Sequence, residues 1–130
     1  MDAQECLRRG EECFDKDDFD QAIVEFTEAV RLDPNLAVAK SHLYTAYYNR
    51  GVTNFQNGEN DQAVADFSEA IRFKPDNAAA YDARGMIHNE TGNFDGIIED
   101  FTEVIRIAQL PMLIFCVAMG IEVNTRPTMP

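Results

Sequence analysis

The feature that most constrains this chain is a motif that recurs along it at nearly regular intervals. Three Arg-Gly pairs, at residues 9–10, 50–51 and 84–85, are each followed by apolar residues at matching offsets. The first two copies agree at offsets +12, +16, +19 and +24 from the glycine, which hold Ala, Phe, Ala and Pro. The third copy keeps the Phe and has Ile97 and Val104 at two of the other offsets. Such self-similarity predicts a fold that stacks one small unit several times.

The repeated residues have helical spacing. Ala22, Phe26 and Ala29 lie four and three residues apart, and the second unit repeats this spacing, so each set shares one helix face. A Gly inside a helix costs about 1 kcal/mol relative to Ala, so we expect close helix contact at the glycine of each Arg-Gly pair. Pro34 and Pro75 end the second helices. Each unit is therefore predicted to be two antiparallel helices joined by a short turn.

This pattern resembles that of the tetratricopeptide repeat family. The family signature W-x-x-L-G-x-x-Y … A-x-x-x-F … A … P fits about residues 3–110 as three units, over about 3–36, 37–77 and 78–110. The position of the family's Trp holds, in order, Cys6, Tyr47 and Tyr81. The resemblance implies an all-α, right-handed superhelical solenoid of three antiparallel helix pairs, and we expect a further C-terminal helix after it.

The spacing between the first two units is longer than the family period. Gly51 and Gly85 are 34 residues apart, whereas Gly10 and Gly51 are 41 apart, so unit two has a seven-residue insertion. Removing residues 40–46 restores a normal junction. Because seven residues are nearly two helical turns, we expect a first helix of unit two over about 36–56 that projects roughly 10 Å past its neighbours. A looped-out bulge is the alternative.

Each unit also places an Arg on its first helix and an acid just before the repeated Phe of its second helix. The three combinations are Arg9 with Glu25, Arg50 with Asp66, and Arg84 with Asp100. We expect an inter-helix ion pair in each unit. The alternative is that both side chains are only solvated.

No combination of residues predicts catalysis, a metal or a cofactor. His42 and His88 lie on separate predicted helices without a Ser or Cys partner, and no Gly-rich phosphate loop occurs. The acidic run at 15–20 resembles a calcium loop but lacks the Gly at its sixth position and has Phe26 in place of the bidentate Glu. Three cysteines without a zinc-binding spacing favour reduced thiols in a cytoplasmic protein. We therefore expect a protein that is not an enzyme.

The charge of the chain restricts its partners. The net charge is −12, which disfavours nucleic acid and anionic membrane surfaces because both would be repelled. A protein or peptide that is apolar with basic flanks is compatible with this charge. The leading interpretation is a non-catalytic protein-interaction module of the adaptor or scaffold type.

The resemblance implies that the first helices of the units line a concave groove for an extended peptide or a partner helix. The matching positions in this sequence are Leu7, Glu11, Tyr48, Asn49, Val52, Phe55, Asp82, Met86 and Asn89. Chaperone co-factors of this family hold a C-terminal carboxylate with two Lys, two Asn and an Arg, of which only Asn49 is present. Because Glu11 and Asp82 would repel such a carboxylate, we do not expect heat-shock chaperone tails to bind.

The segment 111–130 contains, directly after Pro111, eight residues (112–119) that have no polar side chain except a thiol. Pro111 and Gly120 suit the start and stop of a helix of about nine residues, too short for a bilayer, which takes about 20. A helix without a polar face must be buried all round, so we expect it to cover unit three and to form a homodimer interface. The expected interface residues are Leu113, Ile114, Phe115, Val117 and Met119. The alternatives are a cap with an exposed outer side, a strand-like or disordered tail, and, for function, a self-assembling scaffold.

Overall fold

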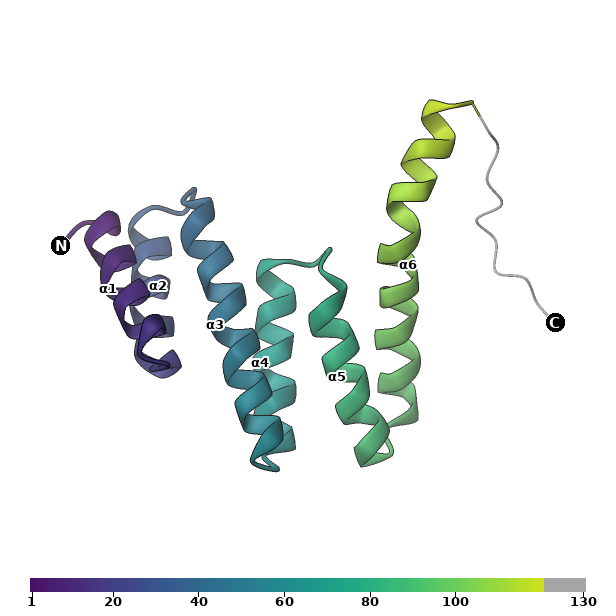
Figure 1. Cartoon of the computed structure of the whole chain (residues 1–130), viewed down its shortest axis with the longest axis horizontal. Helices are drawn as coiled ribbons and strands as arrows, with labels where there is room; N and C mark the ends of the chain where they lie inside the picture. Colours follow the sequence, from purple (N-terminus) through teal and green to yellow (C-terminus); the bar gives the residue numbers. More distant parts are fainter. Residues whose placement is uncertain (121–130) are drawn as a thin grey trace.

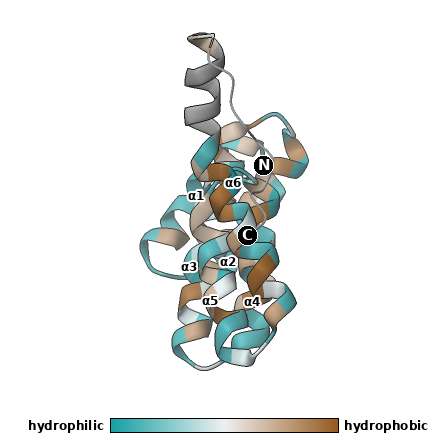
Figure 2. Ribbon diagram, turned by 90° about the vertical axis from the view of Figure 1, so that its right-hand side faces the viewer, coloured by the Kyte–Doolittle hydropathy of each residue, from teal (hydrophilic) through white to brown (hydrophobic). Residues whose placement is uncertain are grey.

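The computed structural model of the chain describes residues 1–120, without the side chains of 110–117. Its helices are α1 (Ala3–Asp15), α2 (Phe19–Leu32), α3 (Ala37–Gln56), α4 (Asn60–Phe73), α5 (Ala78–Thr91) and α6 (Phe94–Ala118). No strand occurs among the described residues. The helices follow one another as antiparallel pairs in a row (Figure 1), and the row is narrow when it is viewed from the α6 end (Figure 2). The predicted all-α solenoid of helix pairs is confirmed.

Local sequence signals explain where several helices begin and end. The carboxylate of Asp18 accepts the backbone N–H of Gln21 at 3.2 Å and caps α2, and Asn77 caps α5 in the same way. Gly92 follows α5 with a φ of 76°, a left-handed conformation that glycine adopts without steric cost. Because the connections are short, each helix runs antiparallel to the one that precedes it in the chain.

The repeated Ala and Phe residues form the core. The motif residues that are at most 1% exposed are Ala22, Phe26, Ala29, Ala63, Phe67 and Ala70. Gly10 packs against the Phe26 ring so closely that an added Cβ would lie 2.4 Å from Cε1. A Cβ at Gly51 would lie 3.0 Å from the same atom of Phe67. This contact gives a physical reason for a glycine inside each first helix.

The seven extra residues of unit two extend a continuous helix, as predicted. Helix α3 has 20 residues, compared with 13 in α1 and 14 in α5. Two residues of the insertion, Leu43 and Ala46, are fully buried and pack with Ile23 and Phe26 of α2. Helix α3 extends past α4 and α5 at its N-terminal end (Figure 1), but the added turns are covered there. The α1–α2 pair is displaced along α3 and covers the added turns (Figure 1), since their apolar side chains would otherwise face water.

The separate C-terminal helix expected from Pro111 is not formed. Helix α6 continues through this residue and has 25 residues in all. A proline inside a helix removes one hydrogen-bond donor and disturbs the preceding turn, but the flanking Leu and Met residues favour helix. No glycine stands between Gly96 and Gly120 to stop it. As a result α6 extends past the end of α5 (Figure 1). Within the described residues, no helix combines the length and the apolar character needed to cross a membrane.

Candidate functional site

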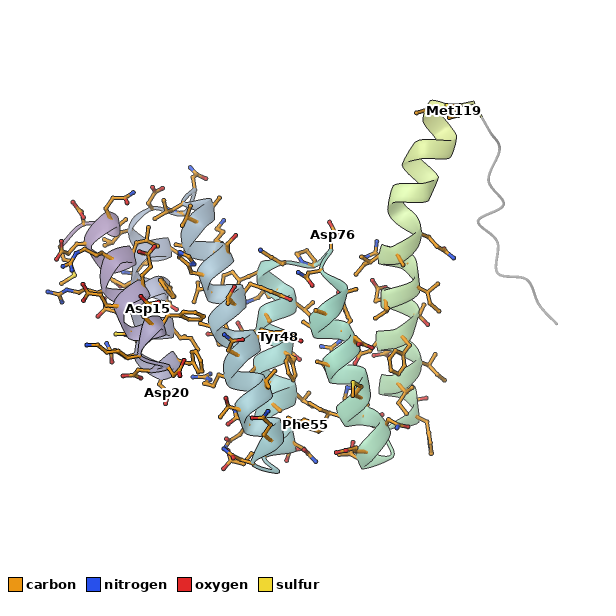
Figure 3. All side chains as sticks on the ribbon, in the orientation of Figure 1. Asp15, Asp20, Tyr48, Phe55, Asp76 and Met119 are labelled. Carbon is orange, nitrogen blue, oxygen red and sulfur yellow. The ribbon has the colours of Figure 1, made fainter. Side chains whose placement is uncertain are left out.

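The predicted groove residues of α3 and α5 differ in burial. On α3, Tyr48, Val52 and Phe55 are half-buried and pack against the core that surrounds Phe67. The ring of Tyr48 meets that of Phe67 edge-on, with 5.3 Å between centroids. Tyr48 and Phe55 lie on the side of α3 that faces α5 (Figure 3). The candidates on α5 are all exposed: Asp82, Met86 and Asn89.

The candidates of unit one lie elsewhere along α3. Leu7 packs with Ala39 near the start of α3, and the carboxylate of Glu11 lies 3.1 Å from Nε2 of His42. Val52 is ten residues further on, which is about 15 Å along a helix axis. The structure therefore separates the candidates of unit one from those of unit two, because the insertion displaces the first pair along α3.

Asn49 lies between these two groups on α3. It is half-buried, and its backbone carbonyl accepts the hydroxyl of Thr53 at 3.1 Å. Of the residues expected at the C-terminal interface, Met119 is 63% exposed. The remaining side chains of that interface lie outside the described part: Leu113, Ile114, Phe115 and Val117.

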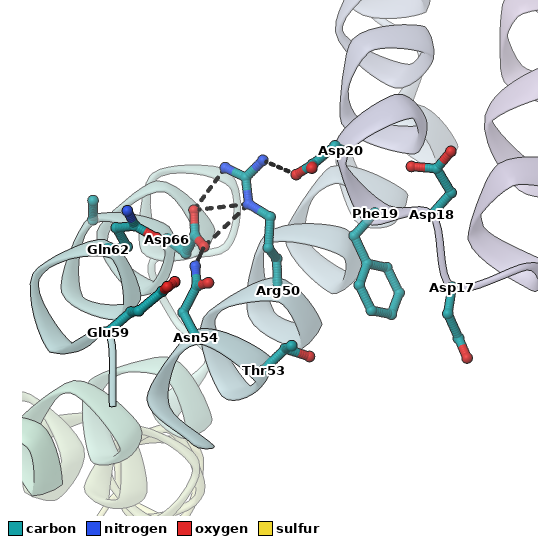
Figure 4. Close-up of a pocket in the computed structure, with 11 residues that line it drawn as sticks. Asp17, Asp18, Phe19, Asp20, Arg50, Thr53, Asn54, Glu59, Gln62 and Asp66 are labelled. Atoms are coloured by element: carbon teal, nitrogen blue, oxygen red, sulfur yellow. Dashed lines mark hydrogen bonds and ion pairs between the residues drawn. The ribbon is translucent and has the colours of Figure 1, made fainter. Parts of the chain in front are cut away.

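Arg50 of α3 joins three helices. Its Nε donates to both carboxylate oxygens of Asp66 at 3.2 and 3.1 Å, and its Nη2 donates to one of them at 2.7 Å. Its Nη1 donates to Asp20 of α2 at 2.9 Å, and the amide of Asn54 donates to Asp66 at 2.8 Å (Figure 4). The hydrogen bonds to Asp66 raise the pKa of Arg50. The guanidinium therefore stays charged and holds unit one against unit two.

Unit three repeats this arrangement around Arg84. Its Nε and Nη2 donate to Asp100 at distances between 2.6 and 3.1 Å, and its Nη1 donates to Ser68 of α4 at 3.0 Å. The Asp100 side chain is 1% exposed, and Nε2 of His88 lies 3.5 Å from its other oxygen. The hydrogen bond to Asp100 raises the pKa of Arg84. The ion pairs predicted for units two and three are confirmed.

The ion pair predicted for unit one is wrong. Arg9 is 48% exposed, and its Nε lies 3.9 Å from Glu5 on its own helix. Glu25 accepts instead from the side-chain amide of Gln21 at 3.3 Å. The position that holds Asn54 or His88 in the other units holds Cys13 in unit one, so the donor that orients the acid there is replaced by a thiol.

An acidic cleft of about 640 Å³ opens beside Arg50. Its walls come from the start of α2, the last turns of α3 and the start of α4 (Figure 4). The carboxylates that line it are Asp17, Asp18, Asp20, Glu59 and Asp66. Sequence reasoning missed this cleft, although the acidic run at 15–20 was a signal. Among the described residues, no group of three or more His, Cys, Asp or Glu side chains is placed to hold a metal ion.

The thiol of Cys6 is a poor nucleophile. It is 1% exposed, and its burial, together with the charges of Glu25 and Glu28, raises its pKa. Because the thiolate is the reactive form, this cysteine acts as a core residue. Cys6 and Cys13 are both free thiols.

Two family models, each described as tetratricopeptide repeat, match the chain at residues 3–36 and 44–77. The seven residues between these matches belong to the beginning of α3. A comparison with proteins of curated function gave no match.

Several solved structures have a similar fold. A crystal structure of MamA is 23% identical with a TM-score of 0.54, over 85% of this chain and 61% of that chain. MamA from residue 41 to its end, from Desulfovibrio magneticus RS-1, is 16% identical with a TM-score of 0.50, over 83% of this chain and 76% of that one. The second TPR of Spaghetti (RPAP3), bound to the HSP90 peptide SRMEEVD, is 20% identical with a TM-score of 0.47, over 82% and 93%. This chain thus spans 61% of the first MamA structure.

Proposed function

Because the chain belongs to the tetratricopeptide repeat family, we propose that it is a non-catalytic protein-interaction module that binds a peptide or partner helix along α3 and α5. The observation that carries this proposal is the apolar surface that these two helices present. Its members, half-buried on α3 and exposed on α5, are Tyr48, Val52, Phe55 and Met86. Repeat solenoids use extended surfaces of this kind for binding, and aromatic residues supply much of the contact energy at interfaces.

The charges near this surface favour an apolar partner with basic flanks. Asp82 is exposed beside Met86, and no Lys or Arg stands among the proposed contact residues. The net charge of −12 adds a field that attracts cationic partners and repels nucleic acid. A partner with a free carboxylate would meet no cation at these positions. The proposal places the protein in the cytoplasm, where its free thiols stay reduced.

The test is a selection of peptides from a displayed random library against the full chain, followed by fluorescence anisotropy with two variants. Met86→Lys alters the proposed binding surface on α5. Val24→Lys is the control, because it alters an exposed position on α2, outside that surface. Both residues are similarly exposed, at 53% and 57%. We expect Met86→Lys to weaken binding by about tenfold or more and Val24→Lys to leave it unchanged. Peptides that bind both variants equally well would contradict the proposal.

The length of α6 favours a second candidate function, which is self-assembly. Helix α6 has 25 residues against 14 in α5, and its free end stands clear of the other helices (Figure 1). We propose that residues 113–119 form a homodimer interface, probed by light-scattering mass of the full chain and of a version that ends at Gln109. A dimer that becomes a folded monomer on truncation supports this function, and a monomeric full chain contradicts it.

A further inference from the structure

The outer face of α6 is apolar and uncovered in the described part of the chain. Ile98 is 65% exposed and Ile105 is 58% exposed. They stand 13 and 20 residues after Gly85. The residues at the same offsets in the first two units are Ile23, Val30, Val64 and Ile71. All four are buried or half-buried and pack in clusters shared with α3 or α5.

Figure 2 looks onto this end of the molecule and shows hydrophobic residues recurring along the described part of α6. In the first two units, the matching face of the second helix is covered by the first helix of the next unit. The described part of the chain, residues 1–120, therefore forms the same packing surface three times and covers two of the three copies. The two covered copies show what kind of helix fits the third.

In each of the two covered copies, the arginine of the covering helix also donates a hydrogen bond to a polar side chain of the covered helix. Arg50 of α3 donates to Asp20 of α2 at 2.9 Å, and Arg84 of α5 donates to Ser68 of α4 at 3.0 Å. These acceptors lie 10 and 17 residues after the glycine of their unit. At the same offsets α6 has Asp95 and Thr102, which are both exposed. The outer face of α6 therefore has a possible hydrogen-bond acceptor for arginine at both offsets, in addition to the two isoleucines.

The helices that cover the first two copies share a short sequence. Residues 46–50 and 80–84 both read Ala-Tyr-x-x-Arg. Ala46 and Ala80 are fully buried, so the small side chain allows close approach. Each Arg lies over the ring of its Tyr, at 5.5 Å in α3 and 5.7 Å in α5, and this contact orients the guanidinium towards the preceding helix.

We propose that the outer face of α6, formed by Asp95, Ile98, Thr102 and Ile105, docks a helix of the Ala-Tyr-x-x-Arg type from a partner protein. The incoming helix lies antiparallel to α6, as α3 does to α2. Its Ala and Tyr pack on the two isoleucines, and its Arg donates to Asp95 or Thr102. This surface is separate from the apolar surface of α3 and α5, so it adds a second binding site to the proposed function.

A second copy of this chain is a poor occupant of the face. Its α1 has Glu5 and Cys6 where α3 and α5 have Ala and Tyr, and Cys6 is already buried in its own unit. Asp95 and Glu99 are exposed on α6, so Glu5 of a second copy would bring a like charge to this face. A helix that brings an arginine has the complementary charge.

The proposal is tested with a helix-stapled, fluorescein-labelled peptide of residues 77–91, which contains the sequence of α5. Anisotropy is measured against the full chain, its Ile98→Glu variant and the control Val24→Glu, whose side chain is also exposed on an apolar position. We expect saturable binding that Ile98→Glu weakens by about tenfold or more and that Val24→Glu leaves unchanged. Absence of saturable binding, or equal binding to Ile98→Glu, overturns the proposal.

The arginine contact is tested by charge exchange. Asp95→Arg in the chain is expected to weaken binding of a stapled peptide of residues 43–56, whose Arg50 uses the aspartate at the offset of Asp95, and to strengthen binding of the same peptide with Arg50→Glu. Equal effects on both peptides contradict the contact. Light-scattering mass of the full chain tests whether a second copy of the chain occupies this face. A dimer that Ile98→Glu converts to a monomer would show that another copy covers the face, and this result overturns the choice of partner.

Discussion

Repeats one and three both have an arginine before the glycine of the first helix and an acid before the Phe of the second helix, but they hold their arginines differently. Arg84 is 20% exposed and is bound by Asp100 and Ser68. Arg9 is 48% exposed and reaches only Glu5. The preceding helix α4 supplies one of the partners of Arg84, whereas Glu25, the acid expected to pair with Arg9, accepts from Gln21 of its own helix. The role of a repeated side chain is therefore set by the adjacent unit as much as by its own.

The largest difference between the two repeats is expected when the arginine of each is replaced by leucine. Arg84→Leu leaves the Asp100 carboxylate buried without its cation, so we expect a loss of about 3–5 kcal/mol in the free energy of unfolding. Arg9→Leu removes an exposed side chain, and we expect a change within about 0.5 kcal/mol. Urea denaturation of both variants measures the difference. Equal losses would show that the two repeats hold their arginines alike.

A double variant separates the ion pair from the packing around it. Arg84→Leu combined with Asp100→Leu removes both charges, and we expect it to recover most of the stability lost by Arg84→Leu alone. Recovery in urea denaturation means that the unpaired carboxylate causes the loss. A double variant as unstable as the single one would assign the loss to side-chain packing.

The glycines give the next largest contrast. A Cβ at Gly10 would lie 2.4 Å from the Phe26 ring, whereas one at Gly85 would lie 3.2 Å from the Phe101 ring. We expect Gly10→Ala to cost about 1–3 kcal/mol through overpacking. Gly85→Ala should change stability by less than about 1 kcal/mol, because the gain in helix propensity offsets the tighter contact. Thermal unfolding of the two variants tests this order, and a more harmful Gly85→Ala would reverse it.

Alkaline pH should destabilise repeat one through its buried thiol. The folded protein raises the pKa of Cys6 above its usual value of 9.0, mainly by burial. The stability from this shift is fully present below pH 9 and is lost as the pH rises through the folded-state pKa, because the unfolded chain releases the proton first. We expect the unfolding free energy to fall less steeply above pH 9 in Cys6→Ala. An identical pH profile would show that the thiol is not responsible.

The smallest effect on stability is expected when the acid and its neighbouring donor in repeat one are replaced by those of repeat two. Glu25→Asp combined with Cys13→Asn reproduces the acid and amide that accompany Arg50 in repeat two. Because Arg9 is half exposed, we expect a gain below about 1 kcal/mol. A double-mutant cycle with Arg9→Leu measures the coupling. A gain that persists without Arg9 would arise from another cause.

Much of the fold follows from local patterns in the sequence. The offsets of Ala, Phe and Pro from each glycine predicted the helix pairs, and the absence of Gly and Pro in residues 40–46 predicted one continuous α3. The ends of α3 were predicted to within a residue. The ion pairs of Arg50 and Arg84 followed from the placement of Arg and Asp on facing helices. These features depend on spacing within a unit, so the sequence determines them.

The tertiary structure decided what depends on packing between units. The added turns of α3 extend past α4 and α5 without being left in water, because the first helix pair lies further along α3 and covers the apolar Leu43 and Ala46. Pro111 was read as a helix start, but it lies inside α6, since one lost hydrogen bond does not stop a helix that has strong helix formers on both sides.

The candidate binding surface shows the same division. Sequence positions identified Tyr48, Phe55 and Met86, but only the displacement along α3 separated Leu7 and Glu11 from them. The acidic cleft beside Arg50 forms where three helices meet, so no single segment predicted it. The sequence by itself determined the helices and the residues on each of their faces, because these follow from local spacing. The tertiary structure decided which faces meet, because burial of apolar surface sets the position of one unit on the next.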